Sequence, residues 1–233
     1  MVLTQQVTTP TADRPRLGIL HRSAQLGVAY TPRELLATDP REFIEWLKIH
    51  EPASLSAGDK ARILAGLPTE GEITELDARS RLKLAAVNRL LEATDRGSSY
   101  EVKVTDVEYA RIVVFARTVI LISKSALWLL DERDLQALVA HEIGHEYFTS
   151  EYADALRARD HRRLKDLELL CDAFAIVTLR RLGMNPARLV AGIEKITRFN
   201  QRLFATRVDN TNYPTVAERR SFAREITTWW HVP

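Results

Sequence analysis

A chain of 233 residues is long enough for one large domain or two small ones, with a sizeable hydrophobic core. Its composition, 45% hydrophobic and 27% charged, is that of a soluble globular protein, and its single cysteine, Cys171, excludes a disulfide within the chain. The net charge of +2 is small for this length, so it gives no general reason to expect nucleic acid or an acidic membrane surface as a partner.

Residues 1–30 are polar and punctuated by proline, which predicts an extended or poorly ordered N-terminal arm. This arm lacks the apolar core of a secretory signal. No stretch of the chain reaches the roughly 18 consecutive apolar residues that are needed to span a bilayer. The sequence therefore predicts a soluble protein without deciding between cytoplasm and periplasm, and membrane association would need a segment outside this chain.

Residues 31–99 predict a helical N-terminal region. Thr31 and Asp39, each followed by proline, are N-cap signals for two helices. After a further short helix, a longer one is predicted at 74–94, with an apolar stripe along one face. The stripe consists of Leu76, Leu82, Leu84, Val87, Leu90 and Leu91. The stretch DRGSSYE, at 95–101, predicts a turn and a domain boundary.

Residues 100–233 predict a unit that contains both strands and helices. Three segments rich in valine and isoleucine, YEVKVTD, ARIVVFAR and TVILIS, predict the strands of a small sheet. Helices are then predicted at about 131–149, about 155–182 and about 186–203, and from about 215. The chain is thus predicted to have an α+β, mostly helical fold, with the arm and the helical region preceding the α+β unit.

The segment LVAHEIGHEYF, residues 138–148, carries two histidines four positions apart. On a helix His141 and His145 lie one turn apart, so both imidazoles can point at one metal ion. Glu142 cannot easily join the same ligand set, but it can reach a water at the metal and act as general base. An H-E-x-x-H string would arise by chance in roughly one chain in a hundred of this length. The assignment therefore depends on a third ligand.

Two positions offer the third ligand that a catalytic zinc site requires. Glu151 has the offset used by a longer three-histidine pattern, but that pattern needs glycine in place of Phe148 and histidine in place of Glu151. Glu168 lies in the helical segment LKDLELLCDAFAIV, with Asp172 one turn further on the same face. A metal would explain both acids, with Glu168 as ligand and Asp172 as acceptor for a ligand imidazole N–H. Taken alone, this helix would favour a solvated acidic pair.

With these residues identified, about residues 100–220 resemble the gluzincin metallopeptidases of the HtpX and CAAX prenyl protease type. The segment LLDERDLQALVAHEIGHEY is similar to that family's active-site helix, and ELLCDAFAIVTLRRLGMNPARLVAGIEKI to its E-x-x-A-D helix and the turn and helix that follow. The resemblance implies a zincin-like catalytic domain with one zinc ion held by His141, His145 and Glu168. It also implies hydrolysis of peptide bonds, with a protein or peptide as substrate.

Near the C-terminus this family has a Thr-His-Pro segment followed by an arginine, and the corresponding stretch here is TNYPTVAERR. Pro214 and Arg219 fit the pattern, whereas Tyr213 stands where the family has histidine. The resemblance therefore makes Tyr213 or Arg219 the candidate for stabilising the oxyanion of the reaction. ARIVVFAR, at 110–117, is a candidate edge strand to which an extended substrate would add as a further strand.

Three other interpretations remain open. The ImmA-type peptidases, which cleave repressors, share the two motifs. A latent protease or a non-catalytic zinc domain would have its cleft filled by the N-terminal region, with His21, His50 or an acidic side chain at the open zinc position. An interaction protein would dock a partner through TTWWH at 227–231, although adjacent tryptophans near a terminus more often pack on their own domain.

Overall fold

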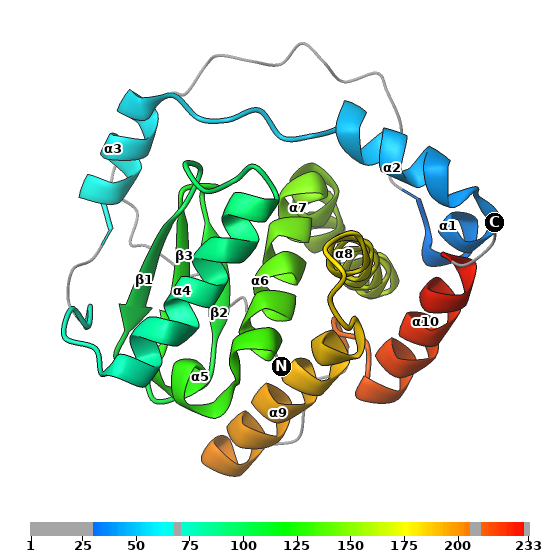
Figure 1. The fold of residues 1–233 in the computed structure, drawn as a ribbon. Coiled ribbons are helices and arrows are strands. Elements are labelled where there is room, and N and C mark those ends of the chain that lie inside the picture. Colours follow the sequence, from blue (N-terminus) through cyan, green and yellow to red (C-terminus); the bar gives the residue numbers. More distant parts are fainter. Residues whose placement is uncertain (1–29, 68–70, 206–210, 231–233) are drawn as a thin grey trace.

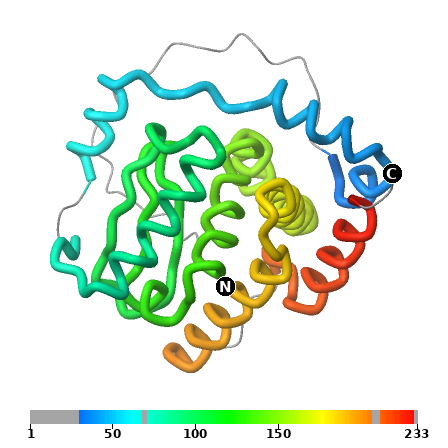
Figure 2. Tube along the Cα trace, viewed as in Figure 1, coloured from blue at the N-terminus to red at the C-terminus, as the bar shows by residue number. Residues whose placement is uncertain are grey.

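The computed structural model describes residues 30–67, 71–205 and 211–230. Their fold is α+β and mostly helical with one small sheet, which confirms the predicted fold class (Figure 1 and Figure 2). The predicted arm lies outside the described residues except for Tyr30. In chain order the elements are α1 (Pro32–Ala37), α2 (Pro40–Ile49), α3 (Ala57–Ala65), α4 (Ala78–Ala93), β1 (Glu101–Thr105), β2 (Ile112–Phe115), β3 (Val119–Ser123), α5 (Lys124–Leu129), α6 (Glu132–Tyr147), α7 (Thr149–Ala158), α8 (His161–Arg181), α9 (Ala187–Phe204) and α10 (Val216–Trp229). Within this part of the chain, no helix combines the length and the apolar character needed to cross a bilayer.

The N-terminal helices begin at the predicted cap residues. Thr31 caps α1 in a reciprocal capping box with Glu34, and Asp39 caps α2 by accepting the N–H of Arg41. The segment between α2 and α3 runs across the top of the view in Figure 1. α4 begins after Asp77, whose carboxylate accepts a backbone N–H three residues further on, so this helix starts later than predicted.

Two positions of the apolar stripe predicted for α4 are wrong: Leu76 precedes the helix, and Leu82 lies on its exposed face. Leu82 is 61% exposed, whereas the next residue, Lys83, is buried together with Val87 and Leu90. The buried face therefore passes through Lys83 and not through Leu82, one residue and about 100° away on a helix. Lys83 tolerates burial because its ammonium group donates a 2.6 Å hydrogen bond to the carbonyl of Leu127 at the end of α5.

The sheet has the strand order β1-β3-β2 and is mixed. β1 pairs with β3 in parallel, and β2 pairs with β3 in antiparallel orientation. The outer edge of β1 is partly covered by a bridge between Glu72 and Thr105, whereas no described strand pairs with the outer edge of β2. In Figure 1, α4 lies in front of the sheet and α6 passes between the sheet and α8. β2 is thus an open edge strand next to the helix that carries the histidine motif.

The C-terminal half follows the predicted order of elements, with two corrections. α5 was not predicted and starts directly after β3, capped by Ser123. The continuous helix predicted at about 155–182 is wrong, because the chain breaks between α7 and α8. Arg159 adopts the left-handed conformation with φ 55° at this break, and Asp160 caps α8. The break turns α7 back against α8.

The hydrophobic core is one continuous cluster of buried side chains that joins the N-terminal helices to the C-terminal half. Trp229 illustrates this connection, since its ring meets Phe43 at 6.2 Å and its indole N–H donates a 2.6 Å hydrogen bond to the carbonyl of Thr38. Trp229 of the TTWWH stretch therefore packs on its own fold, while His231 lies outside the described residues.

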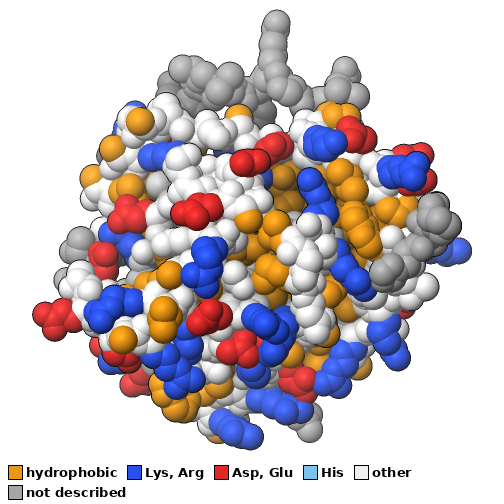
Figure 3. Space-filling model, viewed as in Figure 1, with side chains coloured by type: hydrophobic (Ala, Val, Ile, Leu, Met, Phe, Trp, Pro, Cys, Tyr) orange, Lys and Arg blue, Asp and Glu red, His pale blue; other side chains and the backbone are white. Residues whose placement is uncertain are grey.

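A groove of about 850 Å³ lies between α9 and α10. Small apolar side chains such as Ala187, Ala191 and Ala223 line it, together with Arg180 and Arg224. Figure 3 shows Lys and Arg side chains on the lower part of the face in view, where α9 and α10 lie in Figure 1. The residues of the histidine motif do not line this groove.

α6 and α8 approach each other closely at Gly144. A Cβ atom at this position would lie 3.0 Å from the Cα and 3.2 Å from the Cβ of Cys171. Because both helices are buried at this contact, neither can move away without disturbing the packing around it.

We expect Gly144→Ala to lower the free energy of unfolding by about 1–3 kcal/mol through overpacking. Alanine is otherwise the better helix former, by about 1 kcal/mol. The matched control is Gly58→Ala in α3, where the nearest atom to an added Cβ lies at 3.9 Å, and this change should not reduce stability. Urea unfolding followed by circular dichroism measures both variants, and equal losses in the two would contradict the tight contact.

Candidate metal centre

α6 holds the histidine motif on a rigid support. Its first turn is fixed by a capping box between Asp131 and Asp134. Asp134 is fully buried and forms ion pairs with Arg188 and Lys195 of α9, which tie the start of α6 to that helix. α6 is therefore held at its start by α9, and it packs along α8 at the end that carries the motif.

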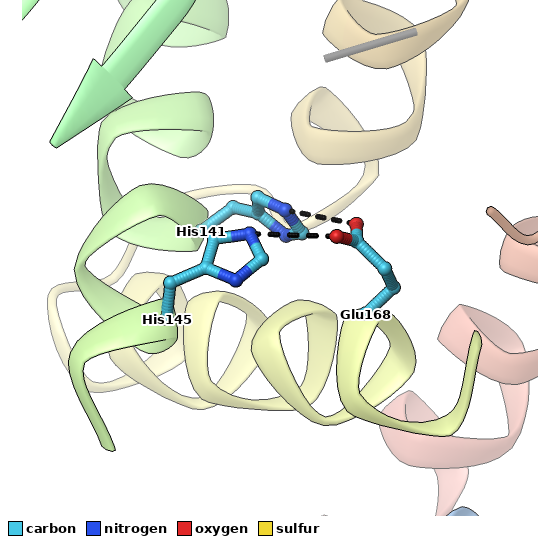
Figure 4. A group of neighbouring side chains, drawn as sticks. All are labelled: His141, His145 and Glu168. Carbon is cyan, nitrogen blue, oxygen red and sulfur yellow. Dashed lines mark ion pairs between the residues drawn. The ribbon is translucent and has the colours of Figure 1, made fainter. Parts of the chain in front are cut away.

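Three side chains of α6 and α8 converge in the interior (Figure 4). Nε2 of His141 lies 3.5 Å from Oε2 of Glu168, and Nε2 of His145 lies 3.6 Å from Oε1 of the same carboxylate. One ligand atom from each residue lies within 4.8 Å of the others. Atoms that each lie about 2.0–2.1 Å from one tetrahedral ion are about 3.4 Å apart. The spacing therefore suits a single metal ion.

The chemistry of these atoms also fits a metal. Nε2 of His141 is buried, and its nearest acceptor, Oε2 of Glu168, lies 3.5 Å away without the geometry of a hydrogen bond. A buried polar atom without a well-formed hydrogen bond is costly, and a bound cation would satisfy it. Two imidazole nitrogens and one carboxylate oxygen are a known donor set of catalytic zinc, which leaves a fourth position for water. The group of His141, His145 and Glu168 could thus hold a metal ion.

Asp172 and Arg219 surround this group. Nδ1 of His141 lies 2.8 Å from Oδ1 of Asp172. Arg219, from α10, donates to both oxygens of Asp172 at 2.6 and 2.7 Å and to Oε2 of Glu168 at 2.8 Å. All these side chains are buried. Such bonds fix the orientation of the ligand side chains. Arg219 is therefore engaged by two acids of the site and is not free in a cleft.

Burial and neighbouring charges set the protonation states. Burial opposes ionisation of Glu168, but the two imidazoles and the guanidinium of Arg219 hold its pKa well below its usual range. Burial lowers the pKa of His145 to about 4, which keeps this imidazole in its neutral, ligating form. Burial also disfavours charge on His141, but Asp172 and Glu168 outweigh it and raise its pKa to about 9. A bound cation would replace that proton.

Glu142 lies beside His141 and faces the open edge of β2. Its side chain is almost fully buried, and burial raises its pKa to about 7 against the opposing effects of a positive charge on His141 and the backbone N–H of Val114. A carboxyl group with a pKa near neutrality is suited to general acid–base work. The structure thus places a candidate base next to the candidate ligands.

Tyr152 also contacts this site, and no sequence signal marks it. Its hydroxyl donates a 3.1 Å hydrogen bond to Oε1 of Glu168, and its ring meets the imidazole of His145 edge-on. Tyr213 is half-buried and close enough to Tyr152 to raise the pKa of its hydroxyl, after the larger effects of burial and Glu168. Tyr152, from α7, thus contacts two candidate ligands, and Tyr213 is its neighbour.

Two other candidate ligands, Glu151 and His50, lie elsewhere. Glu151 is on α7, where its carboxylate accepts a hydrogen bond from Ser150, and it does not belong to the group that could hold a metal. The ring of His50 stacks on Trp46 with 4.3 Å between the centroids, and it is not part of that group either. His21 lies outside the described residues.

Comparison of the chain with models of known protein families gives no match, and comparison with curated proteins gives none either. The site is therefore defined by its own geometry. The likeness to a family is carried only by the motifs on α6, on α8 with the turn and α9 that follow it, and at TNYPTVAERR.

Proposed function

We propose that this protein is a zinc-dependent endopeptidase whose metal is held by His141, His145 and Glu168. The observation that carries the proposal is the spacing of these three ligands for one ion, with Glu142 next to them. When bound, zinc supplies a Lewis acid that polarises a water and a carbonyl. The resemblance to the HtpX and CAAX prenyl protease type supports the same reaction.

Glu142 acts as general base in this proposal. With its pKa raised to about 7, mainly by burial, it can accept a proton from the attacking water and later pass it to the leaving amine. Asp172 and Arg219 position His141 and the carboxylate ligand. Because Arg219 is already bonded to two carboxylates, Tyr213 is the better candidate for a hydrogen bond to the oxyanion.

β2 offers a binding place for an extended substrate. The N–H of Ser123 donates to the carbonyl of Arg111, and hydrogen bonding alternates along an antiparallel pair. The backbone groups of Ile112 and Val114 therefore face away from β3. The N–H of Val114 meets the carboxyl group of Glu142 on this side. A peptide that adds to this edge would thus take the N–H of Val114 from the carboxyl group of Glu142 and bring its scissile bond close to that group.

Metal content and peptide hydrolysis, measured on the same purified chain, test the proposal. We expect one zinc ion per chain, cleavage of casein that a chelator abolishes, and recovery on addition of zinc. Since zinc binds only the folded state, a concentration 100-fold above its dissociation constant should stabilise the protein by about 2.7 kcal/mol. Zinc removal should therefore also lower the melting temperature.

A second preparation without residues 1–30 separates the remaining interpretations. Cleavage that appears only after this removal would show a latent protease, and zinc without cleavage in either form would show a non-catalytic zinc domain. A chain that binds no zinc at all would contradict the proposed metal centre itself.

A further inference from the structure

Tyr152 reaches the candidate metal centre from a third helix, α7. Its hydroxyl lies 3.1 Å from Oε1 of Glu168, and the centroid of its ring lies 5.5 Å from that of His145, with the two ring planes at 83°. The side chain therefore contacts two of the three candidate ligands, one by a hydrogen bond and one by an edge-on ring contact.

The fold fixes Tyr152 in this position. Its backbone N–H donates a 2.8 Å hydrogen bond to the carbonyl of Phe148, where α6 ends and α7 begins. Phe148 is fully buried and stacks on Trp46 at 5.7 Å, which anchors the start of α7. The left-handed turn at Arg159 then holds the other end of α7 against α8. The orientation of Tyr152 thus follows from packing at both ends of its helix.

The carboxylate of Glu168 is held at both of its oxygens. Arg219 donates to Oε2 at 2.8 Å, and Tyr152 donates to Oε1. A carboxylate with a donor on each oxygen cannot rotate about its last bond without breaking a buried hydrogen bond, which is costly. Both hydrogen bonds compete with a metal for lone pairs of the carboxylate, and the bond from Tyr152 does so at Oε1, the oxygen nearer to His145. This arrangement favours coordination through one oxygen over coordination through both.

The charges of the two donors differ. Arg219 carries a full positive charge that it shares with Asp172, whereas the phenol of Tyr152 is a neutral donor. Tyr152 therefore orients the carboxylate of Glu168 without adding charge to the site. A tyrosine that only filled space between α7 and α8 would not need a hydroxyl aimed at a candidate ligand.

We propose that Tyr152 is a positioning residue of the metal site: its hydroxyl holds Oε1 of Glu168, keeps this ligand in a one-oxygen mode, and so leaves a coordination position open for water. The inference rests on the proposed metal centre, but it does not depend on the peptidase reaction. The proposal means that α7, which was not predicted as a separate helix, contributes a residue to the metal site.

Tyr152→Phe tests the proposal, because it removes the hydroxyl and keeps the ring. We expect zinc affinity to fall about 10–100-fold, measured by competition with a chromophoric chelator. In the cobalt-substituted protein, the visible absorption bands should weaken, because a carboxylate that binds through both oxygens raises the coordination number above four. Neither quantity depends on turnover. Circular dichroism of the metal-free variant checks that it is folded.

The matched control is Tyr147→Phe at the end of α6. The hydroxyl of Tyr147 bonds to Arg96 at 2.9 Å and touches none of the three candidate ligands, so this change should leave zinc affinity and the cobalt spectrum as in the wild type. If Tyr152→Phe keeps the zinc affinity and the cobalt spectrum of the wild type, Tyr152 has no positioning role. The proposed metal centre would not be affected by this result. A wild-type protein that binds neither zinc nor cobalt would instead overturn the proposed function.

Discussion

Glu142→Gln should retain one zinc ion per chain and lose peptide hydrolysis by about two to four orders of magnitude, the usual contribution of a general base. Glutamine keeps the shape of the side chain, but it cannot accept a proton from water. Glu142 provides none of the three candidate ligand atoms, so zinc should stay bound in the variant. Metal analysis and hydrolysis of a quenched fluorescent peptide on the same sample measure both effects.

Glu151→Gln is the control for this experiment. Glu151 is a glutamate close in sequence that lies on α7 outside the group of candidate ligands. Its substitution should leave zinc content and turnover unchanged. Loss of zinc in this variant would instead support Glu151 as the third ligand. Full activity in Glu142→Gln would show that another group takes the proton. Loss of zinc in Glu142→Gln would mean that the substitution disturbs the site and does not report on the base.

The residues that could be identified from the sequence are those related by helix geometry. His141 with His145, and Glu168 with Asp172, are each one turn apart, so local periodicity alone places each pair on one face. That the two faces meet around a single point depends on the packing of α6 against α8. The sequence indicated this meeting through histidine and glutamate, which suit a metal, and through the resemblance to a family in which the two motifs form one site.

Tyr152 and the bridging contacts of Arg219 could not be predicted in this way. α7 follows α6 directly, and no side chain caps its start at Phe148, so the usual signal for a new helix is missing. Arg219 belongs to α10 and meets Glu168 and Asp172 only through tertiary packing. The exposed Leu82 has a similar origin, because local periodicity does not determine which face of α4 the sheet and α6 cover.

Arg219→Met should destabilise the metal-free protein by about 3–5 kcal/mol at neutral pH, because two buried carboxylates then share only the imidazolium of His141. Glu168 and Asp172 are each about 1% exposed, so water cannot replace the lost guanidinium. The neighbouring Arg220→Met is the control. Arg220 pairs with Glu194 and has 55% of its side chain exposed, so its loss should cost at most about 1 kcal/mol.

The loss caused by Arg219→Met should depend on pH with a definite sign. The pKa of Glu168 is lowered in the folded state despite burial, through the imidazoles and Arg219, so its ionisation stabilises the fold above the unfolded value of about 4.3. This contribution disappears as the pH falls toward the folded pKa. The stability difference between wild type and Arg219→Met should therefore be full at pH 7 and shrink below about pH 4. Urea unfolding in the presence of a chelator measures it, and a difference that stays constant down to pH 3 would show that Arg219 stabilises the fold by packing and not by its charge.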